Sequence, residues 1–98
     1  MSRNAVRLNA VLAVLEPLRH TPAGLPIVDF TLEHQSQQVE GGQQRQVEFG
    51  ITAKAAGELA VKVAGFRQGS RVEVQGFLNR KHRMSRQVVL HVTNIELI

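Results

Sequence analysis

Ninety-eight residues, 43% of them hydrophobic and 20% charged, suffice for one small domain with a single core. Twelve Lys and Arg against eight Asp and Glu give a formal net charge of +4, which favours anionic partners such as nucleic acid. Cysteine is absent, which excludes a disulfide-based secreted scaffold and a thiolate metal site. The longest apolar run, residues 10–15, is far too short to cross a membrane. We therefore expect a single domain over residues 1–98 of a cytoplasmic protein.

The first strand is predicted over residues 5–15, where apolar side chains, Val14 among them, recur at every second position. The other face of this strand is only partly polar and includes Leu15, which suggests that a further element such as a second subunit covers it. The prolines and the glycine of residues 17–26 break the strand. That segment is therefore predicted to be a loop, and it carries Arg19.

Two further strands are predicted over residues 27–34 and 46–53, because apolar side chains again occupy alternate positions. Between them, residues 35–45 contain five Gln and two Gly and almost no apolar side chain. Such a segment can bury little surface. We therefore predict that it is a mobile hairpin connection, solvated rather than ligand-binding.

The second half of the chain predicts a short helix and two more strands. In residues 54–66 the apolar side chains recur at three and four positions, as in a short amphipathic helix or irregular turn. Residues 67–70 form a tight turn into a fourth strand, residues 72–78. In the last strand, residues 88–98, the apolar side chains change parity, so a bend or bulge is expected near Thr93-Asn94.

Three strands, a short helical connection and two more strands, the last one bent, are the parts of a small closed barrel. The oligonucleotide-binding OB-fold has this order of elements. It binds ligands on strands two and three and on the loops that join strands one to two and four to five. We therefore predict an all-β protein, a five-stranded OB-fold barrel with a short helix or irregular turn between strands three and four. An SH3-like barrel and an open α+β sheet are the alternatives.

The connection between the last two strands is strongly basic. Four of the eight residues from Asn79 to Arg86 are Arg or Lys, and a fifth is His. A cationic hairpin tip of this kind would bind a polyanion, with nucleic acid the leading candidate, because each cation placed near a phosphate releases a condensed counterion. The alternative is that these charges only keep a sheet edge soluble.

The sequence contains no recognisable catalytic or metal-binding motif. The four histidines never have the i, i+4 spacing of a helical metal site, no serine lies in a nucleophile elbow, and no glycine-rich phosphate loop is present. The carboxylates of the predicted strands fall on outward positions, where they do not converge in a pocket. We therefore expect a binding protein rather than an enzyme, with no cofactor, no metal and no small-molecule substrate.

Several short stretches of the chain together carry a family resemblance. They are Thr21–Pro26 (TPAGLP), Phe30–His34 (FTLEH), Arg45–Gln46, Gly69–Arg71, Val74–Phe77 (VQGF), Leu90–His91 and Asn94–Ile98 (NIELI). In this order, and over nearly the whole chain, they resemble the primosomal replication protein N family. Its members are small relatives of the bacterial single-stranded-DNA-binding proteins.

The resemblance implies an OB-fold homodimer that binds single-stranded DNA, joins the primosomal helicase at stalled forks and helps to reload the replicative helicase. It implies no catalytic activity. It also implies DNA-binding roles for the basic residues of the last connection and for Arg45 at the entrance of the third strand. With Arg19 from the loop between strands one and two, the predicted DNA-binding residues are Arg19, Arg45, Arg80, Lys81, His82, Arg83 and Arg86.

The chain departs from this family at one position. Better-known members have an aromatic residue shortly after the Arg-Gln of strand three, whereas this chain has Glu48, followed by Phe49 on the opposite face. Stacking contributes about 1–3 kcal/mol per base in single-strand binders. We therefore expect weaker DNA binding that rests mainly on phosphate contacts. Phe77 either supplies the stacking surface that the missing aromatic residue would give or is buried by a kink at Gly76, and we favour burial. His91 is interpreted as a packed strand residue.

Two alternative functions follow from the same features. The first is a protein-interaction OB module that docks a helicase and binds DNA only incidentally, which Glu48 and the absence of Trp and Tyr favour. The second is an RNA-binding OB domain. A preference for RNA over DNA of equal length would identify it, because only RNA offers a 2′-hydroxyl.

Overall fold

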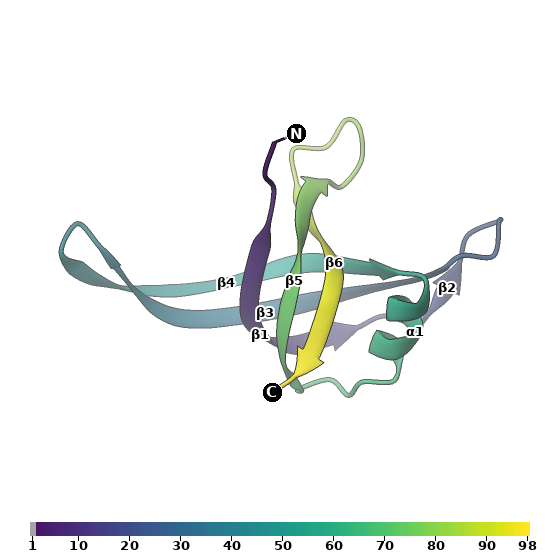
Figure 1. The fold of residues 1–98 in the computed structure, drawn as a ribbon, viewed down its shortest axis with the longest axis horizontal. Helices are drawn as coiled ribbons and strands as arrows, with labels where there is room; N and C mark the ends of the chain where they lie inside the picture. Colours follow the sequence, from purple (N-terminus) through teal and green to yellow (C-terminus); the bar gives the residue numbers. More distant parts are fainter. Residues whose placement is uncertain (1) are drawn as a thin grey trace.

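Alternating apolar and polar residues produce a chain made mainly of strands (Figure 1). The computed structural model describes residues 2–98. Its elements in chain order are β1 (Val6–Leu15), β2 (Arg19–His20), β3 (Pro26–Glu40), β4 (Gln43–Ala56), α1 (Glu58–Ala64), β5 (Arg71–Arg80) and β6 (Val88–Leu97). The predicted helix is thus present, and β2 occupies part of the predicted loop.

Five of the strands close into the predicted barrel. The strand order is β1-β5-β6-β4-β3-β2, and β1 also pairs with β3, which closes the ring and leaves β2 attached outside it. Pairing is antiparallel except between β4 and β6, which run parallel for two residue pairs, Ala53 with Leu90 and Lys54 with His91. The all-β, five-stranded barrel with a helix before its fourth ring strand is therefore confirmed.

The barrel interior is filled by the apolar side chains that the alternation assigns to the inward faces. The large side chains that are fully buried are Leu12, Val28, Phe30, Leu32, Val63, Val72, Val74, Leu90 and Ile95. Burying a side chain of this size stabilises the fold by about 1.5–3 kcal/mol. Helix α1 contributes Ala60 and Val63 to this core, so it plugs one end of the barrel.

The Gln-rich segment is a regular part of the sheet, so the prediction of a mobile connection over residues 35–45 was wrong. β3 and β4 pair without a break from Ile27–Ala56 to Glu40–Gln43. They are joined by Gly41 and Gly42, whose positive φ angles of 60° and 78° suit the two-residue turn that matches strand twist. Beyond the barrel this ladder forms an arm, residues 35–48, that projects from the body (Figure 1).

Two details of the first strand also differ from the prediction. The pairing of β1 with β3 shifts register between Leu12 and Val14, so Val14 is exposed and Leu15 packs against the core. Leu15, one of the apolar residues predicted on the second face of β1, is thus covered by the core of the same chain and needs no second subunit. Arg19 is not in a loop, because a turn after it folds β2 back along the start of β3, where Arg19 pairs with Ile27.

The connection to α1 begins later than the apolar spacing predicts. β4 continues to Ala56, and Gly57, with a positive φ of 72°, ends the strand and precedes the helix. Lys54 therefore lies on a strand and not at the start of a helix. This difference changes the candidate site described below.

The expected irregularity in the last strand is confirmed. Gln75 of β5 faces Asn94, whereas the next residue, Gly76, faces Val92, so Thr93 is an extra residue in β6. Such a bulge bends the strand and allows apolar side chains on either side of it, Val92 and Ile95, to reach the same core.

Candidate nucleic-acid interface

The predicted DNA-binding residues lie at three separate places. Arg45 is near the tip of the arm, Arg19 is on β2, Arg80 ends β5, and the other four belong to the connection between β5 and β6 at the top of the view (Figure 1). Arg45 is paired with Glu40 across the hairpin, with its Nε 3.3 Å from the carboxylate. The structure therefore gathers the cations of one connection and leaves Arg45 apart from them.

The β5–β6 loop, residues 81–87, is a folded turn. The backbone N–H of Lys81 donates to the carbonyl of Gln87 at 2.9 Å, which closes its base. The Nη1 of Arg80 donates to the carbonyl of Arg83 at 2.9 Å. The backbone N–H of Met84 donates to Nδ1 of His82 at 3.3 Å. These bonds hold the loop in shape while its charged ends point to solvent.

The cations of the β5–β6 loop have no acidic partner within residues 2–98. Lys81, Arg83 and Arg86 are exposed, and every ion pair that residues 2–98 make involves other residues; His82 is exposed beside them. Their charge is therefore available to an external anion, which is the state expected of phosphate-binding side chains.

A groove runs between this loop and the barrel wall. Its lining residues are Gly50, Ile51 and Thr52 of β4, Lys81 and Gln87 of the loop, and Val88 and Val89 of β6. Gly50 has no side chain, which lowers the wall opposite the loop. The groove thus has a cation on one side and an uncharged strand surface on the other, an arrangement suited to a phosphate backbone with its bases against the strands.

Lys54 is a cation of this face that the sequence analysis missed. It lies opposite Asp29 on β3 and beside His91 on β6, so its side chain is on the outward surface of the barrel. Its Nζ is 3.9 Å from one oxygen of Asp29, and the Nη2 of Arg19 is 2.9 Å from the other. One carboxylate therefore partly neutralises two cations. Continuing the period of two beyond Ala53 would have identified Lys54.

Phe77 is not buried by the kink at Gly76, so the favoured interpretation was wrong. The Phe77 side chain is 40% exposed on the outward face of β5. Its ring stacks on that of His91, with centroids 5.0 Å apart and an interplanar angle of 1°. His91 is half-buried in this stack, so it is packed as expected.

The other exposed aromatic, Phe49, lies on the opposite side of the sheet from Lys54. Its ring is tilted against His34, with centroids 5.1 Å apart, and Nδ1 of His34 is 2.6 Å from the carbonyl oxygen of Asn9 on β1. Glu48 on the outward face accepts a hydrogen bond from Gln35 at 3.2 Å. Only the Phe77 pair therefore shares a surface with Lys54 and the β5–β6 loop.

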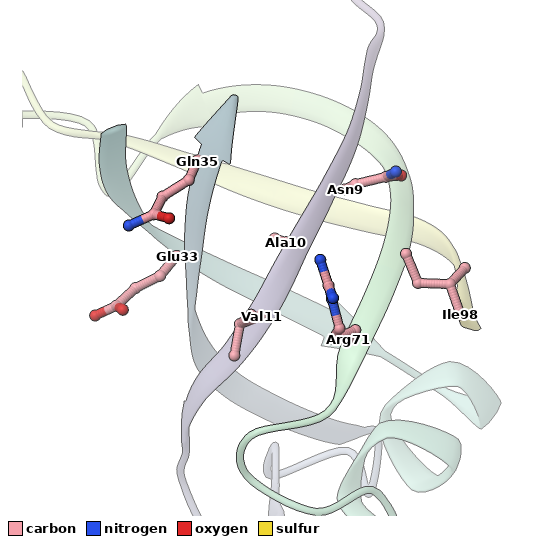
Figure 2. A pocket seen from close by; sticks show the side chains of 7 residues that line it. All are labelled: Asn9, Ala10, Val11, Glu33, Gln35, Arg71 and Ile98. Carbon is pink, nitrogen blue, oxygen red and sulfur yellow. The ribbon is translucent and has the colours of Figure 1, made fainter. Parts of the chain in front are cut away.

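A second hollow lies at the other end of β5 (Figure 2). It opens where β1 leaves β5 for β3, and its charged lining residues are Arg71 and Glu33. One cation and one carboxylate give no net preference for a polyanion. Arg71 begins β5, whereas the basic loop follows its last residue, so this hollow is separate from the groove.

Within residues 2–98, no helix has the length and apolar character needed to cross a membrane. In the same part of the chain, no three His, Asp or Glu side chains gather into a group that could hold a metal ion. The carboxylates that the sequence analysis assigned to outward positions are there, and two of them, Asp29 and Glu73, are in ion pairs.

Relatives of known family share this fold and length. A family model described as "another single-strand binding protein family" matches residues 4–94. A replication restart protein PriB from Nitrosomonas europaea is 43% identical over 98 residues, 100% of this chain and 91% of that protein. The structure of PriB from Ralstonia solanacearum superimposes with a TM-score of 0.91 at 38% identity, covering 98% of each chain.

A more distant solved structure is that of a single-stranded DNA binding protein from Thermus aquaticus. It superimposes with a TM-score of 0.77 at 26% identity and covers 98% of this chain but 50% of its own. The OB-fold and the resemblance noted in the sequence are thereby confirmed. The chain belongs to the PriB family of replication restart proteins.

Proposed function

We propose that this protein is a non-enzymatic, single-stranded-DNA-binding accessory protein of replication restart. The observation that carries the proposal is the cluster of exposed, unpaired cations on the β5–β6 loop beside the groove along β4. Its similarity to PriB proteins and to a single-stranded DNA binding protein supports the choice of ligand. A strand surface flanked by positive charge is the usual arrangement of such sites.

The proposed mechanism is electrostatic capture. Lys81, Arg83 and Arg86 contact phosphates and release counterions, and Lys54 and Arg19 continue the positive surface across the barrel face. Phosphate contacts position the strand but carry no sequence information. Binding is therefore largely indifferent to base sequence. Arg45, on the arm, adds a distant contact for a strand long enough to reach it.

Recruitment of the primosomal helicase completes the proposed function. This partner, the homodimer and the cytoplasmic location rest on the family resemblance and the composition, and they stay predictions. The half-buried Val11 and Ala13 and the exposed Val14 on β1 are apolar side chains that a second subunit could cover.

The test is fluorescence anisotropy of a labelled single-stranded oligonucleotide across a salt series, with duplex DNA and RNA of equal length as controls. We expect a preference for single-stranded DNA and a log affinity that falls with log salt by about 0.7 for each phosphate contacted. Preference for RNA would identify an RNA-binding domain instead. Binding to none of the three at low salt would make the protein an adapter with its basic loop directed at an acidic protein.

Asp29→Asn should strengthen DNA binding. The substitution removes the carboxylate that pairs with Arg19 and Lys54, so both cations become available to phosphate. We expect affinity for single-stranded DNA at low salt to rise by about 3- to 10-fold, because each added phosphate contact contributes through counterion release. Thermal unfolding should change little, since ion pairs this exposed contribute about 0–1 kcal/mol.

The matched control is Glu58→Gln, which removes one negative charge on α1, away from the groove. If the affinity for single-stranded DNA rises by the same factor in both variants, the change in net charge accounts for the gain and Asp29 has no local role. An unchanged affinity in Asp29→Asn would show that Arg19 and Lys54 lie outside the path of the strand.

A further inference from the structure

The stacked pair of Phe77 and His91 leaves one face of the Phe77 ring open. The two rings stack across neighbouring strands, and β5 lies between β1 and β6 in the sheet. The covered face of Phe77 is therefore directed to His91 on β6, and the free face is directed to β1. A flat apolar surface at this position is available to a second flat group.

A hollow lies beside this free face. Its lining includes Phe77 itself, Ala5 and Arg7 on the β1 side, Gln75 of β5 and Thr93 of β6. The space exists because Ala5 has only a methyl group where a longer side chain would cover the ring. Asn4 closes one end, since its side chain donates to the carbonyl of Leu78 at 2.8 Å and accepts from its N–H at 3.0 Å. We call this hollow the Phe77 slot.

The Phe77 slot is polar but nearly neutral. Arg7 donates to the carboxylate of Glu73 from Nε at 3.1 Å and from Nη2 at 2.9 Å, so its charge is compensated. The side-chain amide of Gln75 has no hydrogen-bond partner within residues 2–98 and remains free to donate and accept. One aromatic wall with a free amide beside it fits a nucleobase, whose face stacks and whose edge carries donors and acceptors.

We infer that the Phe77 slot receives one unpaired base of the bound strand, an inference that rests on the proposed DNA binding. Lys81, the first residue of the cationic loop, follows Phe77 by four residues and has the same parity, so a strand held there by its phosphates passes close to the slot. The slot supplies base stacking that is lost on β4, where this chain has Glu48 near the position of the aromatic residue of better-known family members. It makes part of the affinity depend on the presence of bases and not on phosphates alone.

The test compares an oligothymidylate with an abasic strand of the same length, at a salt concentration high enough to weaken the phosphate contacts. We expect the wild-type protein to prefer the base-bearing strand. Phe77→Leu, which keeps apolar volume but removes the ring, should lower affinity for oligothymidylate about tenfold and leave the abasic strand unaffected. Ala5→Leu should act in the same way by filling the slot, and it leaves Phe77 intact if the ring variant unfolds.

Phe49→Leu is the matched control, because it removes an equally exposed ring on the opposite side of the sheet; it should leave both affinities unchanged. A wild-type protein that binds both strands equally, or a preference that survives Phe77→Leu and Ala5→Leu, overturns the slot but not the proposed function. In that case the occupant of the slot would be an aromatic side chain of a protein partner and not a base. Failure of the wild-type protein to bind either strand, even at low salt, overturns the proposed function and the slot with it.

Discussion

Gly76→Ala should destabilise the protein by about 3 kcal/mol or more, at the upper end of the cost of overpacking a core. Gly76 lies where the bulge at Thr93 brings β6 close to β5, and it is buried. A methyl group there would overlap the carbonyl oxygen of His91 and lie 2.9 Å from its carbonyl carbon and 3.0 Å from the Cα of Val92. All three atoms belong to the backbone, so no side-chain rotation relieves the overlap.

The measurement is chemical and thermal unfolding of Gly76→Ala beside Gly50→Ala. At Gly50 an added Cβ would meet only the carbonyl oxygen of Leu32, at an ordinary 3.8 Å, so that variant should unfold like the wild type. In a domain of this size each kcal/mol lowers Tm by about 4–8 °C. A Gly76→Ala protein within 0.5 kcal/mol of the wild type, a margin typical of surface substitutions, would show that the strands separate easily at the bulge.

The barrel could be predicted from sequence because its inward residues obey the period of two. Phe30 and Leu32 on β3 and Val72 and Val74 on β5 are buried where the alternation places them. The bulge near Thr93 was also predictable, since the change of parity in the last strand is visible without a partner strand. In each case the pattern of burial along one strand carries the information.

The errors occur where pairing and not burial determines the structure. The arm buries little, so its composition resembles a loop, yet its backbone is satisfied by the ladder from β3 to β4. The exchange of Val14 and Leu15 between the faces of β1 depends on a register shift against β3. Neither effect leaves a signal in the hydrophobicity of a single segment.

The candidate site was predictable in its charge but not in its layout. The basic loop was evident from composition, whereas Lys54 was hidden because the helical spacing was extended back into β4. The neutralising role of Asp29 could not be foreseen, since it requires the spatial neighbours Arg19 and Lys54. The exposure of Phe77 likewise depends on which strand lies beside it.

The largest functional effect should come from reversing two charges on the β5–β6 loop. Lys81→Glu combined with Arg83→Glu removes two proposed phosphate contacts and places one carboxylate at the groove and a second on the loop beside it. We expect affinity for single-stranded DNA at low salt to fall on the order of 100-fold. The slope of log affinity against log salt should become shallower by about 1.4, because each contact contributes about 0.7. Anisotropy titrations over a salt series measure both quantities.

The control for this variant must separate position from net charge. Arg67→Glu combined with Arg71→Glu makes the same change, from a formal +4 to 0, because each replacement subtracts two charges. Both residues are exposed; Arg71 begins β5 and Arg67 lies in the connection before it, whereas the loop follows the last residue of β5. The control should therefore weaken binding only slightly and keep the salt slope of the wild type. Equal losses in the two variants would mean that DNA responds to the overall charge of the protein, and the loop would lose its role as the binding site.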